Sequence, residues 1–418
     1  MSGIAGHGLM SIKSFYERGI RMHNVRKVTE DVYYVGASDR RLNLFENIYP
    51  IPNGISYNSY LVLDEKTVLL DTIDHSVSRQ FLENVEYVLG ERTLDYLIVN
   101  HMEPDHCATI GDIVLRYPDV TIVGNAKTFT MMKQFFGFDV DGHSKVIKEG
   151  ETLNTGRHTF AFAMIPMVHW PECMVTYDAA DKILFSADAF GTFGALNGNI
   201  FADEVDFEKE WLAEARRYLA NIVGKYGTQV LGALKKAAAL DIRMICPLHG
   251  PVWRENLGWF IEKYQTWANY TPEDHTVLIL YASIYGNTEN AVNALAGKLA
   301  DAGERKIAMY DVSVTDPSYL LAEAFRCDRI VFACPTYNAG IFPKMETLLA
   351  ELAAHNFQKR KIVIIENGTW AISSGKQMRE ILSSLKGMEI MESTLTVKSS
   401  LKDEQLPSLD EIVNFLTA

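Results

Sequence analysis

Leu94-Asp95-Tyr96-Leu97-Ile98-Val99-Asn100 is followed at once by His101-Met102-Glu103-Pro104-Asp105-His106. The first half is a short aliphatic run, which predicts a buried strand. The second half places two imidazoles and two carboxylates directly after that strand. A mixed nitrogen and oxygen set suits iron, manganese or zinc better than soft thiolate-binding ions. We therefore predict a metal-binding loop, in which Pro104 keeps Glu103 extended and prevents a helix from starting early.

Three later strands end in side chains of the same kinds. The predicted strand 159–166 leads to His169, the strand 182–186 leads to Asp188, and the strand 244–247 leads to His249. Each residue alone would more often be an ordinary surface residue. Ligands at the ends of rigid strands, however, can converge on one point with little entropy left to lose. Their shared position therefore predicts a single site built from four strand ends.

Length and composition limit the classes of function. With 418 residues, of which 48% are hydrophobic and 22% charged, the chain is expected to form a soluble globular protein of two domains. A formal net charge of -13, with no basic stripe to neutralise phosphates, argues against a nucleic-acid partner, and none is expected. No apolar run approaches the roughly 18 residues that span a bilayer, so no membrane is expected. Five cysteines without CxxC spacing predict reduced thiols in the cytoplasm.

The order of patterns predicts an N-terminal extension over 1–24, a metal domain over 25–270 and a second domain over 271–418. In the second domain strands and helices alternate five times, which is typical of a doubly wound parallel sheet. The predicted strands are 277–281, 306–311, 329–334, 361–366 and about 388–396. Ligands of such sheets bind at the C-terminal ends of the strands.

Three loops at those ends suit a flat cofactor with one phosphate. Residues 283–288 offer hydroxyls, a glycine and a helix N-terminus, but neither the lysine of a triphosphate loop nor GxGxxG. The loops 335–340 and 367–370 add backbone donors and aromatic rings. The predicted cofactor-binding residues are Ser283, Ile284, Tyr285, Gly286, Asn287, Thr288, Pro335, Thr336, Tyr337, Asn338, Ala339, Gly340, Asn367, Gly368, Thr369 and Trp370. A plain α/β domain with ordinary turns is the alternative.

The order of the candidate ligands resembles the metallo-β-lactamase superfamily, whose first motif usually reads HxHxDH. Here the motif reads HxExDH, with Glu103 in place of the second histidine. This replacement, the stretches 168–172 (VHWPE) and 186–191 (SADAFG), and the flavodoxin-like SxYGNT and PTYNAG loops are similar to the flavodiiron proteins, also called A-type flavoproteins. The resemblance implies an α/β fold with an N-terminal αββα metallo-β-lactamase-like sandwich and a C-terminal flavodoxin-like doubly wound parallel sheet.

The resemblance also implies roles for individual residues. One iron would be held by His101, Glu103 and His169, the other by Asp105 and His249, with Asp188 bridging them. His106 is a ligand in some members of that family and not in others. Tyr218 matches a tyrosine thought to face the pocket. Some members carry a histidine near the position of Phe45-Glu46, and this chain has none there.

In this family, FMN passes electrons to a non-haem diiron centre that reduces dioxygen to water, nitric oxide to nitrous oxide, or both. We expect a separate electron donor, either a rubredoxin-like protein or reduced deazaflavin, because no CxxC module follows the second domain. A head-to-tail homodimer, or a dimer of dimers, is expected. Two alternatives stay open: a dinuclear zinc hydrolase of the metallo-β-lactamase superfamily, and a flavin electron carrier whose metal domain is structural. Glu103 argues against the first and the full ligand set against the second.

Overall fold

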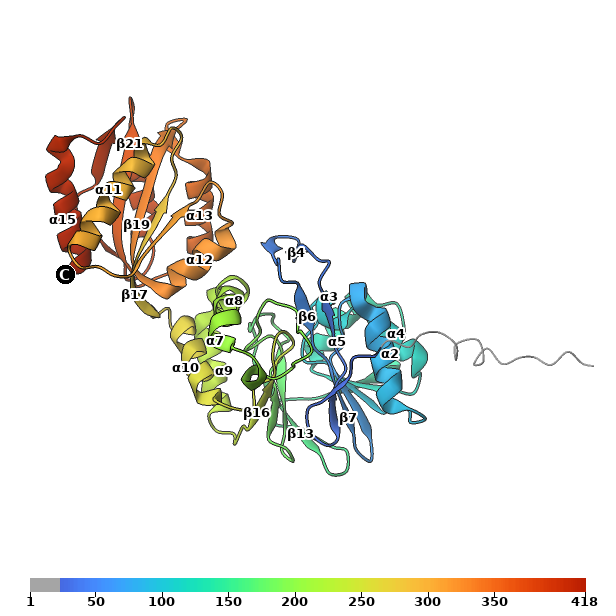
Figure 1. The fold of residues 1–418 in the computed structure, drawn as a ribbon. Helices are drawn as coiled ribbons and strands as arrows, with labels where there is room; N and C mark the ends of the chain where they lie inside the picture. The colour runs from blue at the N-terminus through green and yellow to red at the C-terminus, as the bar shows by residue number, and fades with distance from the viewer. Residues whose placement is uncertain (1–22) are drawn as a thin grey trace, which may run out of the picture.

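A computed structural model describes residues 23–418 and shows two α/β units in chain order (Figure 1). The predicted extension, residues 1–24, lies outside the described residues except for its last two positions. No helix of the described part is long and apolar enough to cross a membrane.

The N-terminal unit is built on two mixed sheets. The first contains seven strands in the order β1 (Arg26–Lys27), β2 (Val32–Tyr34), β7 (Tyr60–Leu63), β8 (Thr67–Leu70), β9 (Tyr96–Ile98), β10 (Thr121–Gly124) and β11 (Ser144–Val146). The second contains β12 (Thr152–Asn154), β13 (Thr159–Met164), β14 (Met174–Asp178), β15 (Ile183–Phe185) and β16 (Met244–Cys246). Helices α2 (Ser78–Leu89), α4 (Ile110–Arg116) and α5 (Ala126–Phe135) lie on one side, and α9 (Gly227–Ala237) and α10 (Leu257–Ala268) on the other (Figure 1). The predicted αββα sandwich is confirmed.

Strand register explains why distant residues meet. Strands β8, β9 and β10 are parallel, and Ile98 pairs with both Leu70 and Val123. Strands β15 and β16 are also parallel, with Phe185 opposite Cys246. Parallel strands that end level with one another deliver their following loops to the same edge. The loops after β9, β15 and β16 therefore leave their two sheets side by side.

One local prediction is confirmed and two are wrong. Glu103 is extended, as predicted, and α3 (Pro104–Cys107) starts no earlier than Pro104, whose fixed φ and missing N–H suit the first helical position. The apolar spacing of residues 207–223 predicts one helix, but the structure divides this stretch into α7 (Phe207–Glu210), α8 (Leu212–Tyr218) and a π-helical turn (Leu219–Val223), since Trp211 leaves helical geometry with its ring buried. The last strand is divided into β22 (Glu389–Ile390) and β23 (Leu395–Lys398), which pair with different parts of β21.

The C-terminal unit is a parallel sheet in the order β18 (Ile307–Asp311), β17 (Asp274–Tyr281), β19 (Cys327–Tyr337), β21 (Lys361–Gly368) and β22, with β23 also on β21. Its helices are α11 (Asn287–Asp301), α12 (Pro317–Arg326), α13 (Pro343–Ala354), α14 (Ser374–Ser383) and α15 (Leu406–Thr417). The strand order reverses between β17 and β19, so their following loops open onto one crevice. The predicted doubly wound fold is confirmed.

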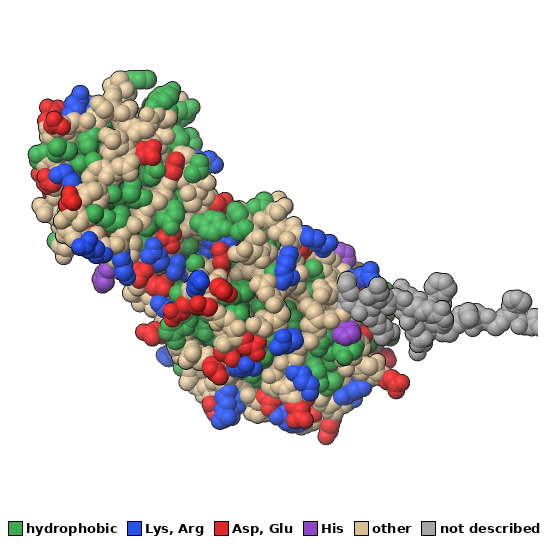
Figure 2. Space-filling view, viewed as in Figure 1, with side chains coloured by type: hydrophobic (Ala, Val, Ile, Leu, Met, Phe, Trp, Pro, Cys, Tyr) green, Lys and Arg blue, Asp and Glu red, His purple; other side chains and the backbone are tan. Residues whose placement is uncertain are grey.

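The two units meet along α12 and at the start of β17. Arg217 of α8 is 1% exposed, and its guanidinium stacks on Tyr319 of α12 at 4.3 Å and donates to Ser318 Oγ at 3.0 Å. Arg216 donates to Glu273, the residue before β17, at 2.7 Å. Figure 2 shows charged side chains of both signs gathered where the units meet. Because β17 runs away from this junction for eight residues, the loops after it lie about 25 Å from it.

Candidate metal centre and cofactor loops

The first cluster of candidate ligands consists of His101, Glu103, His169 and Asp188. Glu103 Oε2 lies 3.2 Å from His101 Nε2 and 2.9 Å from His169 Nε2. Asp188 Oδ2 lies 3.3 Å and 3.1 Å from the same two nitrogens. All four ligand atoms fall within one small volume, so a single cation could contact them together.

The second cluster consists of Asp105, His106 and His249. Asp105 Oδ2 lies 3.3 Å from Nε2 of each histidine, and the two Nε2 atoms are 3.0 Å apart. Short helix α3 carries Asp105 and His106, which is how the turn begun at Pro104 contributes to the site. His106 points into the cluster together with His249.

Asp188 lies between the two clusters. Its Oδ2 faces the first, and its Oδ1 lies 3.1 Å from His106 Nε2 and 3.7 Å from His249 Nε2. Both oxygens of Asp188 and both of Asp105 are buried without a hydrogen-bond partner in residues 23–418. Buried carboxylate oxygens are rarely left unsatisfied. The oxygens and nitrogens that converge here therefore fit two metal ions sharing Asp188.

The pocket is strongly negative. Burial opposes a charge on the His169 ring, but the carboxylates of Asp188 and Glu103 outweigh it and raise the pKa of His169 to about 10. Burial likewise opposes ionisation of Asp188, yet the neighbouring His106 and His101 rings hold its pKa well below the usual range. Bound cations supply this positive charge while the imidazoles remain neutral.

Two carboxylates behind the ligands orient them, and the sequence predicted neither role. Glu172 Oε1 accepts from His101 Nδ1 at 2.8 Å and from the Met102 N–H at 2.9 Å. Asp71 Oδ1 accepts from the backbone N–H groups of Asn100 and His101 at 2.7 and 3.2 Å. Asp71 directly follows the aliphatic strand β8, which is a local signal, whereas Glu172 contacts His101 across 71 residues of chain and has no such signal.

Two further side chains cover the pocket. Tyr218, a predicted site residue, is fully buried with its ring 5.4 Å from that of His249, and its hydroxyl has no partner in the described chain. Glu46 was missed: it forms the tip of the hairpin β4 (Leu44–Phe45)–β5 (Tyr49–Pro50), where it is close enough to Glu103 to feel its charge. Burial and the Glu103 charge raise the pKa of Glu46 to about 8. An acid thus lies where some family members have histidine.

The predicted cofactor loops lie together at the free end of the second unit. Gly286 has φ +87° before α11 and donates its N–H to Ser283 Oγ at 3.1 Å, and a Cβ there would meet no atom within 4 Å. Asn367 Nδ2 donates to Thr288 Oγ1 at 3.2 Å, which ties the third loop to the first. The rings of Tyr285 and Trp370 are 92% and 81% exposed. Figure 2 shows hydrophobic side chains at this end, which suits a flat ring system.

The rest of the predicted cofactor residues occupy the same strand ends. Thr336 Oγ1 accepts from the N–H groups of Ser373 and Ser374 at 3.0 and 3.1 Å. Asn338 and Ala339 form the turn between β19 and β20 (Gly340–Ile341) with positive φ of 51° and 60°. These loops leave backbone donors and a glycine at the crevice and fit a phosphorylated flavin.

Each of the two units matches a known protein family. Residues 55–250 match the family described as ODP family beta lactamase, and residues 279–407 match flavodoxin. The anaerobic nitric oxide reductase flavorubredoxin of Vibrio vulnificus is 31% identical over 348 residues, covering 82% of this chain and 70% of that protein.

Among solved structures, rubredoxin oxygen:oxidoreductase from Desulfovibrio gigas superposes with a TM-score of 0.88 at 27% identity, covering 94% of this chain and 97% of that one. A variant of the flavo di-iron protein of Thermotoga maritima gives 0.86 at 26% identity, with coverages of 94% and 97%.

The chain belongs to the flavodiiron protein family. It is a flavoprotein oxidoreductase, and the cofactors predicted from its sequence, FMN and a diiron centre, are confirmed by the flavodoxin match and the two donor clusters.

Proposed function

We propose that this oxidoreductase reduces dioxygen, nitric oxide or both, with FMN as the immediate source of electrons. The observation that carries the proposal is Asp188, whose two oxygens face two separate groups of ligand atoms. One relative is named as a nitric oxide reductase and one structural neighbour as an oxygen oxidoreductase, which supports both gases as substrates.

The proposed ligands follow the two clusters. His101, Glu103 and His169 would hold one iron, Asp105, His106 and His249 the other, and Asp188 would bridge them. We include His106 because its Nε2 lies as close to Asp188 as the ligand nitrogens of the first cluster do. Two irons in these positions would supply the electrons and the binding of the gas.

The protein's own side chains would shape the reaction space. Phe45 packs edge-on to His249 at 5.5 Å, and Phe193 packs edge-on to Tyr218 at 5.1 Å, so apolar rings exclude water from this side of the pocket. We propose that the unpartnered Tyr218 hydroxyl donates a hydrogen bond to the bound gas. Glu172 and Asp71 would hold the ligand loop in place.

Assembly follows from where the cofactor loops lie. We propose that FMN binds the loops 283–288, 335–340 and 367–370, whose end of the sheet points away from the first unit (Figure 1). A path of about 25 Å through one chain is too long for fast electron transfer, so a head-to-tail homodimer, or a dimer of dimers, would bring one subunit's FMN beside another's irons.

The electron donor would be a rubredoxin-like protein or reduced deazaflavin. The name of the Desulfovibrio gigas neighbour supports a rubredoxin-type donor. All five cysteines are free and buried, which agrees with a reducing compartment, and we propose the cytoplasm.

Elemental analysis and a visible spectrum of the purified protein test this function. We expect two irons and one FMN per chain, and turnover of oxygen or nitric oxide with a reduced rubredoxin-type donor. Two zinc ions and no gas turnover would restore the hydrolase alternative, and loss of flavin would contradict the role of the second unit.

A further inference from the structure

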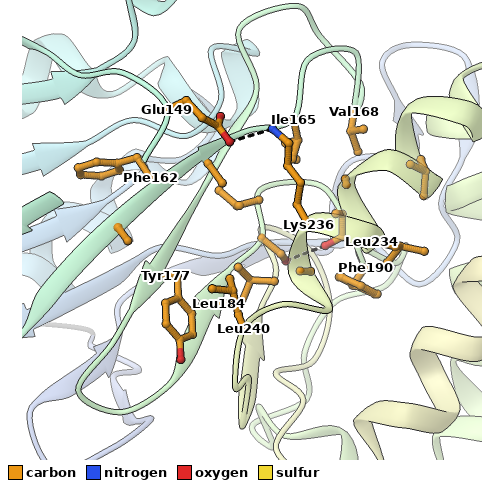
Figure 3. Close-up of a pocket in the computed structure, with 18 of the residues that line it drawn as sticks. Glu149, Phe162, Ile165, Val168, Tyr177, Leu184, Phe190, Leu234, Lys236 and Leu240 are labelled. Atoms are coloured by element: carbon orange, nitrogen blue, oxygen red, sulfur yellow. Dashed lines mark hydrogen bonds and ion pairs between the residues drawn. The ribbon is translucent and has the colours of Figure 1, made fainter. Parts of the chain in front are cut away.

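An apolar cavity of about 320 Å³ lies in the outer layer of the first unit (Figure 3). Helix α9 forms one wall through Val230, Ala233 and Leu234. The outward faces of β13 to β15 form the other through Ala161, Val175 and Leu184. Cavities lined by such residues stay dry and accept small apolar molecules.

The inner end of the cavity touches the back of the metal centre. Val168 and Ala189 line it, and each precedes or follows a candidate iron ligand, His169 or Asp188. In the loop after β15, Ala187 and Phe190 both have positive φ, of 52° and 67°. Asp188 of this loop belongs to the metal clusters, and the next two residues, Ala189 and Phe190, line the cavity. These loops therefore connect the cavity wall directly to two of the candidate ligands.

Tyr264 marks the same boundary. Its ring lines the cavity and packs against Phe190 with centroids 4.6 Å apart. The side chain is 1% exposed, and its hydroxyl has no hydrogen-bond partner of good geometry within residues 23–418.

An exposed ion pair lies at the outer rim of the cavity. Lys236 Nζ donates to Glu149 Oε1 at 2.9 Å and to the Met164 carbonyl at 2.7 Å, and Figure 3 shows the contact with Glu149. These two side chains are 48% and 52% exposed. An exposed ion pair of this kind contributes little stability, so the rim is a weak barrier.

We propose that this cavity binds the apolar diatomic substrate, dioxygen or nitric oxide, and delivers it to the metal centre past Phe190 and Tyr264. The inference rests on the proposed function. Among residues 23–418, the charged side chains that line the cavity are Lys236 and Glu149, which pair with each other at the rim, so an anionic ligand finds no unpaired cation inside. A small uncharged gas suits the apolar lining of the cavity, and it is also the substrate proposed for the metal centre.

Xenon pressurisation of holoenzyme crystals tests the binding site directly, because xenon occupies dry apolar cavities without any turnover. We expect xenon density between Ala233 and Val175. The variant Ala233→Trp should fill the space and remove the density while iron and flavin contents stay unchanged. Ala161→Phe, on the opposite wall, provides a second filling variant if the first does not fold. Ala238→Trp, exposed at the end of α9 and outside the lining, is the matched control.

Steady-state kinetics then test the access route. Filling the cavity should raise KM for the gas about threefold to tenfold with kcat unchanged, since binding and not chemistry is hindered. An empty cavity in wild-type crystals under xenon would overturn the proposal, as would a co-purified larger apolar molecule inside it. Loss of xenon with an unchanged KM would also overturn it. Xenon binding in an enzyme that turns over neither gas would instead show that the proposed function is wrong.

Discussion

The Nδ1 atom of His101 lies 2.8 Å from Oε1 of Glu172, and both side chains are completely buried. A carboxylate accepts only, so this contact requires the proton on Nδ1 and leaves Nε2 free to face the metal centre. The same oxygen accepts from the Met102 N–H, which fixes the backbone that follows the ligand. The position of His101 is therefore determined from two sides by one acid.

Replacing this acid should weaken one metal position without emptying the flavin site. For Glu172→Gln we expect iron affinity to fall about 10-fold to 100-fold, because a neutral amide replaces the carboxylate that orients the ring and makes its Nε2 more basic. Iron release to a chelator, followed beside the flavin spectrum, measures the effect. Glu91→Gln, on an exposed residue, is the control. Equal iron release from both variants would contradict the role of Glu172.

The bridging assignment predicts a larger loss at Asp188. Asp188→Ala removes the two oxygens that face the two clusters, so we expect loss of iron with FMN retained. Asp188→Asn keeps the shape but removes the charge that attracts both cations, and we expect it to bind less iron than wild type. Iron and flavin analysis of the two variants is sufficient. Two irons and full activity in the alanine variant would refute the bridge.

Replacement of Gly286 should have the opposite effect, with loss of FMN and retention of iron. Its φ of +87° is a conformation that a β-branched residue does not adopt without strain, and the space beside it is open for a ligand. Gly286→Val should therefore reduce FMN content strongly while both irons remain. Gly297→Val in the same helix, where a Cβ also meets nothing within 4 Å, should keep its flavin. Normal flavin content in Gly286→Val would contradict the assignment of this loop as the phosphate site.

Site residues with a signal in their own stretch of sequence could be predicted, and those placed only by contacts distant along the chain could not. Strand ends such as those before His101 and His249 carry a local signal, and parallel pairing brings such ends together, so the two donor clusters could be predicted. Glu46 and Glu172 could not, because their contacts with Glu103 and His101 are set by the path of a hairpin and of a loop. The π-helical turn over 219–223 was missed because its sequence also suits an ordinary helix.

The junction between the two units should depend on Arg217. Its guanidinium is held by Phe193 and Tyr319 at 4.4 and 4.3 Å and by Glu214 at 2.7 Å. It also donates to the Pro50 carbonyl at 2.8 Å, which connects the hairpin that carries Glu46.

For Arg217→Leu we expect a loss of about 3–5 kcal/mol in the free energy of unfolding, because Glu214 loses its charged partner. Urea unfolding measures this loss. Arg254→Leu, whose ion pair with Asp203 is more exposed, should cost under about 1 kcal/mol. Similar costs for the two would contradict the importance of this junction.

The free energy of unfolding should depend on pH because of His158. This residue precedes β13, at the opposite end of that strand from the loop that carries His169. Its Nδ1 lies 2.9 Å from Asp178 Oδ2 and its Nε2 3.1 Å from Asp31 Oδ2, with Arg157 and Asp181 beside them. Burial opposes the charge, but Asp178 and Asp31 outweigh it and raise the pKa of His158 to about 9.

A histidine whose pKa is raised on folding stabilises the folded state fully below its unfolded pKa of about 6.5, and this stabilisation is lost as pH rises through about 9. His158→Gln should therefore be less stable than wild type by about 2 kcal/mol at pH 6, and the difference should shrink by pH 10. Urea unfolding of both proteins at each pH isolates this residue, because the contribution of the metal centre is common to the pair. His275→Gln, at a side chain that is 95% exposed, should stay within about 0.5 kcal/mol of wild type at every pH. A difference for His158→Gln that does not change between pH 6 and 10 would mean that the ring is neutral when folded, and that Arg157 and not the imidazole balances the charge of Asp31.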